Sequence, residues 1–181
     1  MHNKKIIKTI LTANIALTLS SGIAVSENLV EAGEWSYLAD TVMGGISEGQ
    51  AHYKDTSSGT EITLSGQVST ANNGGFIQIR LPIAKGLSTD KTGIKVKVKV
   101  NGERYYIHIR NTSTRLPWHY YQQGFNTKNT WQELKLPFEL FKKSSSIMRG
   151  KMNIRTIKTI GVVAYGKDHT ASISVKSLEF Y

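Results

Sequence analysis

Cysteine is absent from this chain of 181 residues, and proline occurs only three times. The absence of cysteine excludes disulfide bonds, thiolate metal sites, a cysteine nucleophile and a lipidated N-terminal cysteine. Acidic residues are few as well: 13 aspartates and glutamates against 23 lysines and arginines give a formal net charge of +10. The basic residues are spread along the chain and form no long run. The charge therefore favours contact with anionic polymers or lipid headgroups over nucleic acid binding.

Long hydrophobic runs are also missing, because polar residues interrupt even the most apolar stretch, at 10–19. That stretch follows Lys4, Lys5 and Lys8, and small residues at 24–26 precede Glu27. This is the order of regions in a secretory signal peptide. The alternative is a membrane anchor, which needs ~20 apolar residues. We expect residues 1–26 to be cleaved on export (Ala32 ends a second candidate site). Residues 27–181 would then form one domain in the periplasm or outside the cell.

Sequence motifs of catalysis are missing too. The histidines at positions 2, 52, 108, 119 and 169 show no short metal-ligand spacing. The chain has no nucleophile elbow, Walker loop or dinucleotide fingerprint. We therefore predict a binding protein that is not an enzyme, with no catalytic residue, no metal and no cofactor.

Short alternating runs separated by glycine, asparagine, aspartate and serine dominate the chain after residue 35. This pattern is typical of an all-β sandwich or barrel. A short helical turn is predicted at 138–141, after Pro137. Strands are predicted near 50–54, 60–65, 76–81, 93–100, 104–110, 119–125, 131–136, 158–165 and 171–180.

One hairpin is predicted in detail. Residues 94–100 alternate apolar residues with lysine, and Asn101-Gly102 is the favoured sequence of a two-residue turn. The register pairs residues 94, 96 and 98 with 109, 107 and 105, so that every pair on the core face is apolar. The other face would gather a solvent-facing stripe, which we predict to be the contact surface for a partner. The stripe comprises Lys95, Lys97, Lys99, Arg104, Tyr106, His108 and Arg110.

Two glycine pairs stand out among the features that are present, in DTVMGGIS (40–47) and NNGGF (72–76). Glycine costs about 0.5–1 kcal/mol relative to alanine when it is ordered, so such pairs indicate positive φ or close approach of another group. Asp40 is placed to accept hydrogen bonds from amides of its loop. Arg80, if partly buried, needs a carboxylate partner. We expect Asp40 and Arg80 to pair and to tie the two glycine loops together. The alternative is that Asp40 binds a ligand or cation.

The densest aromatic cluster lies at residues 118–121, where Trp118 and Tyr120 are candidate ligand contacts. Sugars are bound by flat aromatic rings, whose faces cover apolar CH groups while polar groups at the rim form hydrogen bonds. The alternative is that a strand buries alternate residues of the cluster, whatever its function. Trp131, at the start of another predicted strand, is expected to be a packing residue.

The chain contains, in this order, Trp35, DTVMGGIS (40–47), GQVSTANNGGFIQIR (66–80), FNTKNTWQELKLPFELF (125–141) and Met148-Arg149-Gly150. The same order is seen in the complex I intermediate-associated protein 30 family, which the chain resembles from about Trp35 to Tyr181. The resemblance implies a galactose-binding-domain-like jelly roll, related to factors that assist the assembly of respiratory complex I. The motif residues expected to be structural are Asp40, Gly44, Gly45, Ser47, Asn73, Gly74, Gly75, Phe76, Arg80, Trp131, Arg149 and Gly150.

These observations predict an exported jelly-roll β-sandwich that works by binding. By the resemblance, its client would be a protein in the course of assembly. The alternative is a carbohydrate-binding module of the cell envelope, with the aromatic cluster as the glycan contact.

Overall fold

The computed structural model describes residues 27–84 and 87–181, so the predicted signal peptide lies outside the described residues. Within these ranges, no helix has the length and apolar character that crossing a membrane requires. The helical elements are single turns: α1 (Leu29–Ala32), η1 (Asp40–Met43), η2 (Ala71–Asn73), η3 (Phe138–Leu140) and η4 (Ile154–Thr156). The strands are β1 (Ser36–Ala39), β2 (Glu48–Thr56), β3 (Gly59–Val68), β4 (Phe76–Pro82), β5 (Gly93–Val100), β6 (Arg104–Asn111), β7 (Tyr121–Asn126), β8 (Gln132–Pro137), β9 (Lys142–Lys143), β10 (Ile157–Tyr165) and β11 (His169–Phe180).

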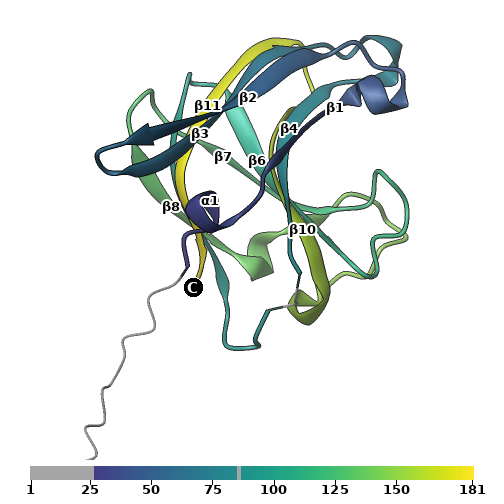
Figure 1. Cartoon of the computed structure of the whole chain (residues 1–181). Coiled ribbons are helices and arrows are strands. Elements are labelled where there is room, and N and C mark those ends of the chain that lie inside the picture. The colour runs from purple at the N-terminus through teal and green to yellow at the C-terminus, as the bar shows by residue number, and fades with distance from the viewer. Residues whose placement is uncertain (1–26, 85–86) are drawn as a thin grey trace, which may run out of the picture.

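Two antiparallel sheets pack face to face (Figure 1). The six-stranded sheet has the order β1-β4-β10-β6-β7-β9, and the five-stranded sheet has the order β2-β3-β11-β5-β8. Apart from the consecutive pairs β2–β3 and β6–β7, neighbouring strands within each sheet are not consecutive in the chain, as is usual for a jelly roll. The predicted all-β jelly-roll sandwich is confirmed, and each of the nine predicted strands overlaps an observed one. The short edge strands β1 and β9 were not predicted.

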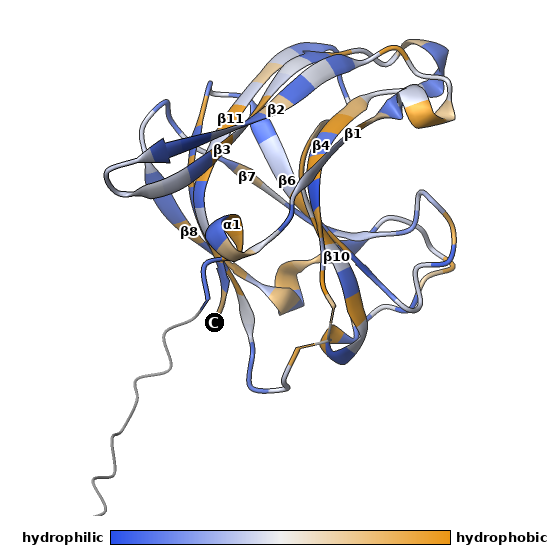
Figure 2. Ribbon diagram, in the orientation of Figure 1, coloured by the Kyte–Doolittle hydropathy of each residue, from blue (hydrophilic) through white to orange (hydrophobic). Residues whose placement is uncertain are grey.

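The core lies between the two sheets and is built by alternation along the strands. In β5 the apolar residues 94, 96, 98 and 100 are at most 1% exposed, whereas the lysines between them are partly exposed. Residues 105, 107 and 109 of β6 and residues 160 and 162 of β10 are buried in the same way. Figure 2 shows this mixture of orange and blue along the ribbons. Burial of one face of each sheet fixes which residues point inward, because shifting a strand by one residue would bring charged side chains into the core.

The predicted hairpin between residues 93–100 and 104–110 is wrong in its pairing. β5 pairs with β11 and β8 in the five-stranded sheet, while β6 pairs with β10 and β7 in the six-stranded sheet. The segment at Asn101 is a corner between sheets: its side-chain amide donates to Thr170 O (2.8 Å), and its Oδ1 accepts from Tyr105 Oη (2.8 Å). Only Gly102 of the predicted turn pair has a positive φ, of 92°. The inward faces were nevertheless assigned correctly, because an alternating pattern specifies a face and not a neighbour.

The predicted basic stripe is therefore divided between opposite sides of the sandwich. Lys95, Lys97 and Lys99 lie on the outer face of the five-stranded sheet, whereas residues 104, 106, 108 and 110 belong to the other sheet. Two of these lysines have local partners: Lys95 forms an ion pair with Glu179 (3.1 Å), and Lys99 lies 5.5 Å from the ring centroid of Trp131. The stripe does not form one continuous contact surface.

Candidate ligand-binding pocket

Asp40 ties the two glycine loops together, and it does so through backbone amides. Its buried carboxylate accepts hydrogen bonds from Ser47 N (2.9 Å), from Phe76 N (3.1 Å), and from Ser47 Oγ and Gly75 N. Burial raises the pKa of Asp40, but the hydrogen bonds from Gly75, Ser47 and Phe76 outweigh this effect and hold the pKa below its ordinary value. The predicted structural link between the loops is present, with a different partner from the one expected.

Each glycine pair contributes one residue for backbone conformation and one for close approach. Gly44 and Gly75 have φ values of 89° and 126°, in the region that favours glycine. A Cβ on Gly45 or on Gly74 would collide with the carboxylate of Asp40. Both glycine motifs therefore pack around the carboxylate of Asp40.

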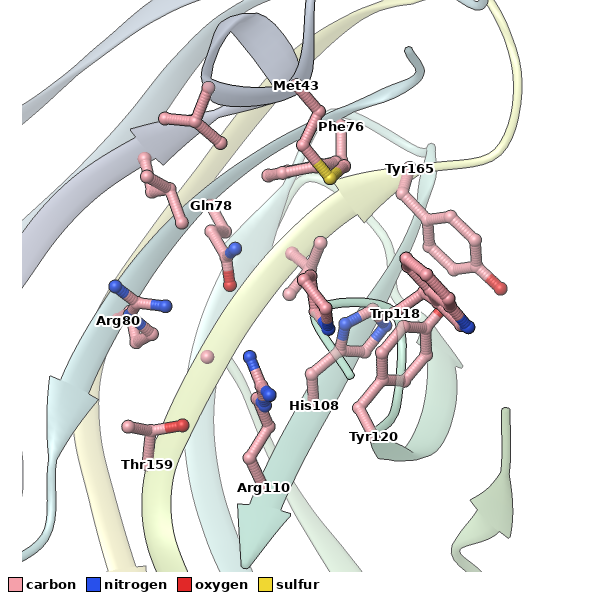
Figure 3. A pocket seen from close by; sticks show the side chains of 15 residues that line it. Met43, Phe76, Gln78, Arg80, His108, Arg110, Trp118, Tyr120, Thr159 and Tyr165 are labelled. Carbon is pink, nitrogen blue, oxygen red and sulfur yellow. The ribbon is translucent and has the colours of Figure 1, made fainter. Parts of the chain in front are cut away.

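The predicted Asp40–Arg80 pair does not form. In the described part of the chain, the ion pairs are Lys95–Glu179, Lys167–Glu103 and Lys176–Glu61, and the guanidinium of Arg80 has no hydrogen-bond acceptor there. The physical reason is that four donors from the glycine loops already satisfy the carboxylate. Arg80 instead points from β4 into a pocket on the outer face of the six-stranded sheet (Figure 3).

This pocket has a volume of about 440 Å³ and lies over β4, β10 and β6. Its rim is formed by the glycine-loop turn η1 on one side and by the segment after β6 on the other. In Figure 2 the turn η1 carries an orange patch beyond β1, where Val42 and Met43 are 64% and 53% exposed. The lining residues are Leu38, Val42, Met43, Phe76, Gln78, Arg80, His108, Arg110, Pro117, Trp118, Tyr120, Thr159, Gly161, Val163 and Tyr165.

The strand register creates the hollow at the centre of the pocket. Gly161 in β10 lies opposite Arg80 of β4 on one side and opposite His108 of β6 on the other. Because Gly161 has no side chain, no side chain separates Arg80 from His108 across the three strands. The amide of Gln78 reaches over the glycine, since a Cβ there would lie 2.7 Å from Gln78 Oε1. The pocket floor is thus a property of this strand and its register.

Aromatic rings form one wall of the pocket. His108 and Tyr120 stack with ring centroids 3.9 Å apart and an interplanar angle of 11°, and Tyr165 meets His108 edge-on at 5.3 Å. Trp118 lies beside them and is 58% exposed (Figure 3). His119 and Tyr121 are buried. Both predictions for this cluster are thus compatible: alternate residues are buried, and the other two line the pocket.

His108 is held in its neutral form. Burial lowers its pKa to about 3, and a hydrogen bond with Gln122 offsets only part of this shift. Its buried Nε2 has no hydrogen-bond partner among residues 27–84 and 87–181. A buried polar atom without a partner is unusual in a folded protein.

The burial of neutral His108 predicts a dependence of stability on pH. Its folded-state pKa lies below the ordinary value of 6.5, so between about pH 6.5 and 3 the unfolded chain binds the proton first. Stability should therefore fall on acidification, by no more than about 1.4 kcal/mol per pH unit from this group. His108→Gln should lose less stability than the wild type between pH 7 and pH 4.5 in urea unfolding. His52→Gln, on the exposed strand β2, should follow the wild type; identical losses in all three proteins would contradict the assignment.

The remaining predicted site residues lie elsewhere. Tyr106 packs edge-on against Tyr165 (4.6 Å), and Arg104 lies over the Tyr106 ring at 5.5 Å, next to the pocket. Trp131 is on the opposite sheet, beneath Lys99 and Lys176. Arg149 and Gly150 lie in an exposed loop, where Tyr121 Oη donates to Arg149 O (2.9 Å).

Sequence reasoning missed the pocket residues Gln78, Thr159, Gly161 and Tyr165. A signal for one of them was available, because a glycine inside an apolar strand marks a bulge or close approach. Among the described residues, no group of three histidines or carboxylates is placed to hold a metal ion.

The comparison with family models gives one decisive match. The model of complex I intermediate-associated protein 30 (CIA30) matches residues 25–175. The chain belongs to the CIA30 family. The glycine loops tied by Asp40 and the rim that they form lie inside the matched range, so the pocket is part of this CIA30 domain. A comparison with curated proteins gives no significant match.

Solved structures similar to the CIA30 domain include carbohydrate-binding modules. One is a family 11 module from Clostridium thermocellum in complex with a β-1,3-1,4-mixed-linked tetrasaccharide, with a TM-score of 0.67 and 13% sequence identity. The match covers 81% of this chain and 87% of the module. The family 11 module of a cellulosomal cellulase from the same organism has a TM-score of 0.68 at 12% identity, and the match covers 86% of this chain and 94% of that module. A family 30 module has a TM-score of 0.58 at 9% identity, with 80% of each chain covered. At these identities the likeness shows the fold alone.

Proposed function

We propose that this CIA30 domain is a non-enzymatic binding domain of an exported protein, in the periplasm or outside the cell, and that it holds a carbohydrate in the pocket of the six-stranded sheet. The observation that carries the proposal is the exposed ring of Trp118 beside the stacked pair His108–Tyr120. Exposed aromatic faces beside polar groups suit a sugar, which has apolar CH faces and hydroxyl edges. The similar family 11 module in complex with a tetrasaccharide supports the same ligand class.

The composition of the pocket favours binding over hydrolysis. Most glycoside hydrolases use a pair of carboxylates on either side of the scissile bond. The residues that line this pocket in the described chain include no aspartate or glutamate. Asp40, next to the rim, is fully occupied by its four hydrogen bonds.

The test compares two tryptophans on opposite sheets. The exported protein, Trp118→Ala and Trp131→Ala would be assayed on a glycan array and by affinity electrophoresis in neutral β-glucans and polyuronates. We expect Trp118→Ala to lose at least about tenfold in affinity, equivalent to ~1.4 kcal/mol. Trp131→Ala, which alters the outer face of the other sheet, should bind as the wild type does. Equal binding by all three proteins, or no glycan bound by the wild type, would refute the proposal.

A second candidate is a protein client, as the family name implies. The observation in its favour is the exposed apolar rim, where Val42, Met43 and Ile46 are each more than half exposed. Contiguous apolar side chains on a surface often mark contacts with other proteins. Pull-down from the protein's own envelope fraction separates the two candidates. A specific protein lost on Met43→Ser but retained on Trp118→Ala would favour the client.

A further inference from the structure

We propose that the pocket selects an acidic sugar, whose carboxylate binds between the guanidinium groups of Arg80 and Arg110. This inference rests on the proposed function, because it names the class of carbohydrate that the same pocket takes. The two arginines approach from opposite sides of β10, from β4 and β6, and Figure 3 shows both guanidinium groups directed into the pocket.

The pocket holds positive charge with no protein counter-charge. Its lining contains two arginines and no carboxylate, and His108 is neutral. Burial, and then the nearby charge of Arg80, lower the pKa of Arg110, so the two guanidinium groups lie close enough to repel each other. A partly buried like-charge pair is unfavourable unless an anion compensates it. A bound carboxylate supplies that compensation.

The two arginines also differ in how their guanidinium groups are held by the protein. Arg110 Nη2 donates to the carbonyl oxygens of Thr114 (3.1 Å) and Leu116 (3.0 Å), which fixes its side chain without neutralising it. The guanidinium of Arg80 has no hydrogen-bond partner and no ion pair among the described residues. A guanidinium fork matches the planar geometry of a carboxylate and can bind it through two parallel hydrogen bonds. One arginine is therefore positioned in advance, and the other is free to close on the ligand.

The aromatic wall distinguishes a sugar acid from a simple anion. Trp118 and Tyr120 lie in the same pocket as the arginine pair, and Gly161 places no side chain between Arg80 and His108. A pyranose ring against the aromatic wall would direct a carboxylate toward the arginines. Without Lys4, Lys5 and Lys8 of the predicted signal peptide, the net charge of +10 becomes 10 − 3 = +7, which would still attract an acidic polysaccharide over a longer range.

The experiment uses galacturonate and glucuronate oligosaccharides, each with its methyl ester as a neutral probe of the same shape. Calorimetric titrations would compare the exported wild-type protein, Arg80→Gln and the control Arg155→Gln, which removes an exposed charge outside the pocket. We expect the wild type to bind at least one acid about tenfold or more tightly than its ester. This ratio should fall to near one in Arg80→Gln and persist in Arg155→Gln. The preference should also weaken between 50 and 500 mM salt, because added ions screen the charges.

Each other outcome overturns a defined part of the inference. Equal binding of acid and ester by the wild type, with loss of both in Trp118→Ala, would refute acid selection and leave the carbohydrate proposal standing. A preference that persists in Arg80→Gln would refute the arginine assignment. Equally tight binding of a sulfated oligosaccharide, or competition by inorganic phosphate at the same concentration, would refute the sugar carboxylate as the preferred anion. If no oligosaccharide binds, the inference and the proposed function both fall.

Discussion

Asp40→Ala is expected to lower the free energy of unfolding by about 3–5 kcal/mol, because it leaves several buried donors without an acceptor. The carboxylate accepts from the amides of Ser47, Gly75 and Phe76 and from the Ser47 hydroxyl. An unsatisfied buried donor costs about 1–3 kcal/mol, and neighbouring losses do not simply add. The substitution also unties both glycine loops, so Val42 and Met43 should no longer hold the pocket rim. Urea unfolding and thermal melting measure the loss.

The control for this prediction is Asp55→Ala. Asp55 is exposed on β2 and accepts a single hydrogen bond, from Thr60 Oγ1 at 2.9 Å. Its replacement should change stability by less than about 0.5 kcal/mol, as is usual for surface sites. An Asp40→Ala protein that unfolds at the same denaturant concentration as Asp55→Ala would contradict the structural role of the carboxylate.

Acid should reduce the difference in stability between the wild type and Asp40→Ala. The folded-state pKa of Asp40 lies below the ordinary value of 3.8, so its contribution to stability is complete above that pH. The contribution is lost as the pH falls through the folded-state pKa, since the carboxylate is then protonated in both states. The loss of stability caused by Asp40→Ala should therefore stay constant from pH 7 to about pH 5 and shrink in stronger acid.

The sequence predicts most of the fold because binary patterning is a local property. Alternating apolar residues identified nine strands and, in the segments 94–100 and 104–110, the buried faces, and glycine chemistry identified the tie at Asp40. Strand neighbours are not local, and the segments 93–100 and 104–110 show why. A short turn with Gly102 suits a hairpin and equally suits a corner between two sheets. The choice is made by β11 and β10, which lie far along the chain and occupy the edges that the hairpin would have used.

The site is less predictable than the fold for a related reason. Trp118 and Tyr120 were identified from their own chemistry, and they do line the pocket. Arg80 was assigned to Asp40 because a partly buried guanidinium needs an anion, but backbone amides satisfied that carboxylate first. The pocket itself depends on three strands in one register, with Gly161 between Arg80 and His108. No local pattern contains that arrangement.

Gly161→Val is expected to abolish glycan binding while the protein still folds, with a loss of at least about a hundredfold, or roughly 3 kcal/mol. The valine side chain would occupy the space between Arg80 and His108 at the pocket floor. Its Cβ would first meet Gln78 Oε1, at 2.7 Å, which is the end of a flexible side chain and can move. The φ of Gly161 is not in the positive region that disfavours other residues, and a β-branched residue is well suited to a strand. Stability should therefore change little, whereas the cavity is lost.

Gly124→Val is the control for this effect. Gly124 lies in β7 of the same sheet but outside the pocket lining, and a Cβ there would meet Arg104 Nε at 2.7 Å and the ring of Tyr106 at 2.8 Å. Both variants add the same side chain to this sheet, and the contact with the Tyr106 ring makes the steric cost larger at Gly124 than at Gly161. Only Gly161→Val fills the pocket, and only it should lose the oligosaccharide that the wild type binds. Equal binding by the two variants, with both melting near the wild-type temperature, would mean that the glycan binds elsewhere on the domain.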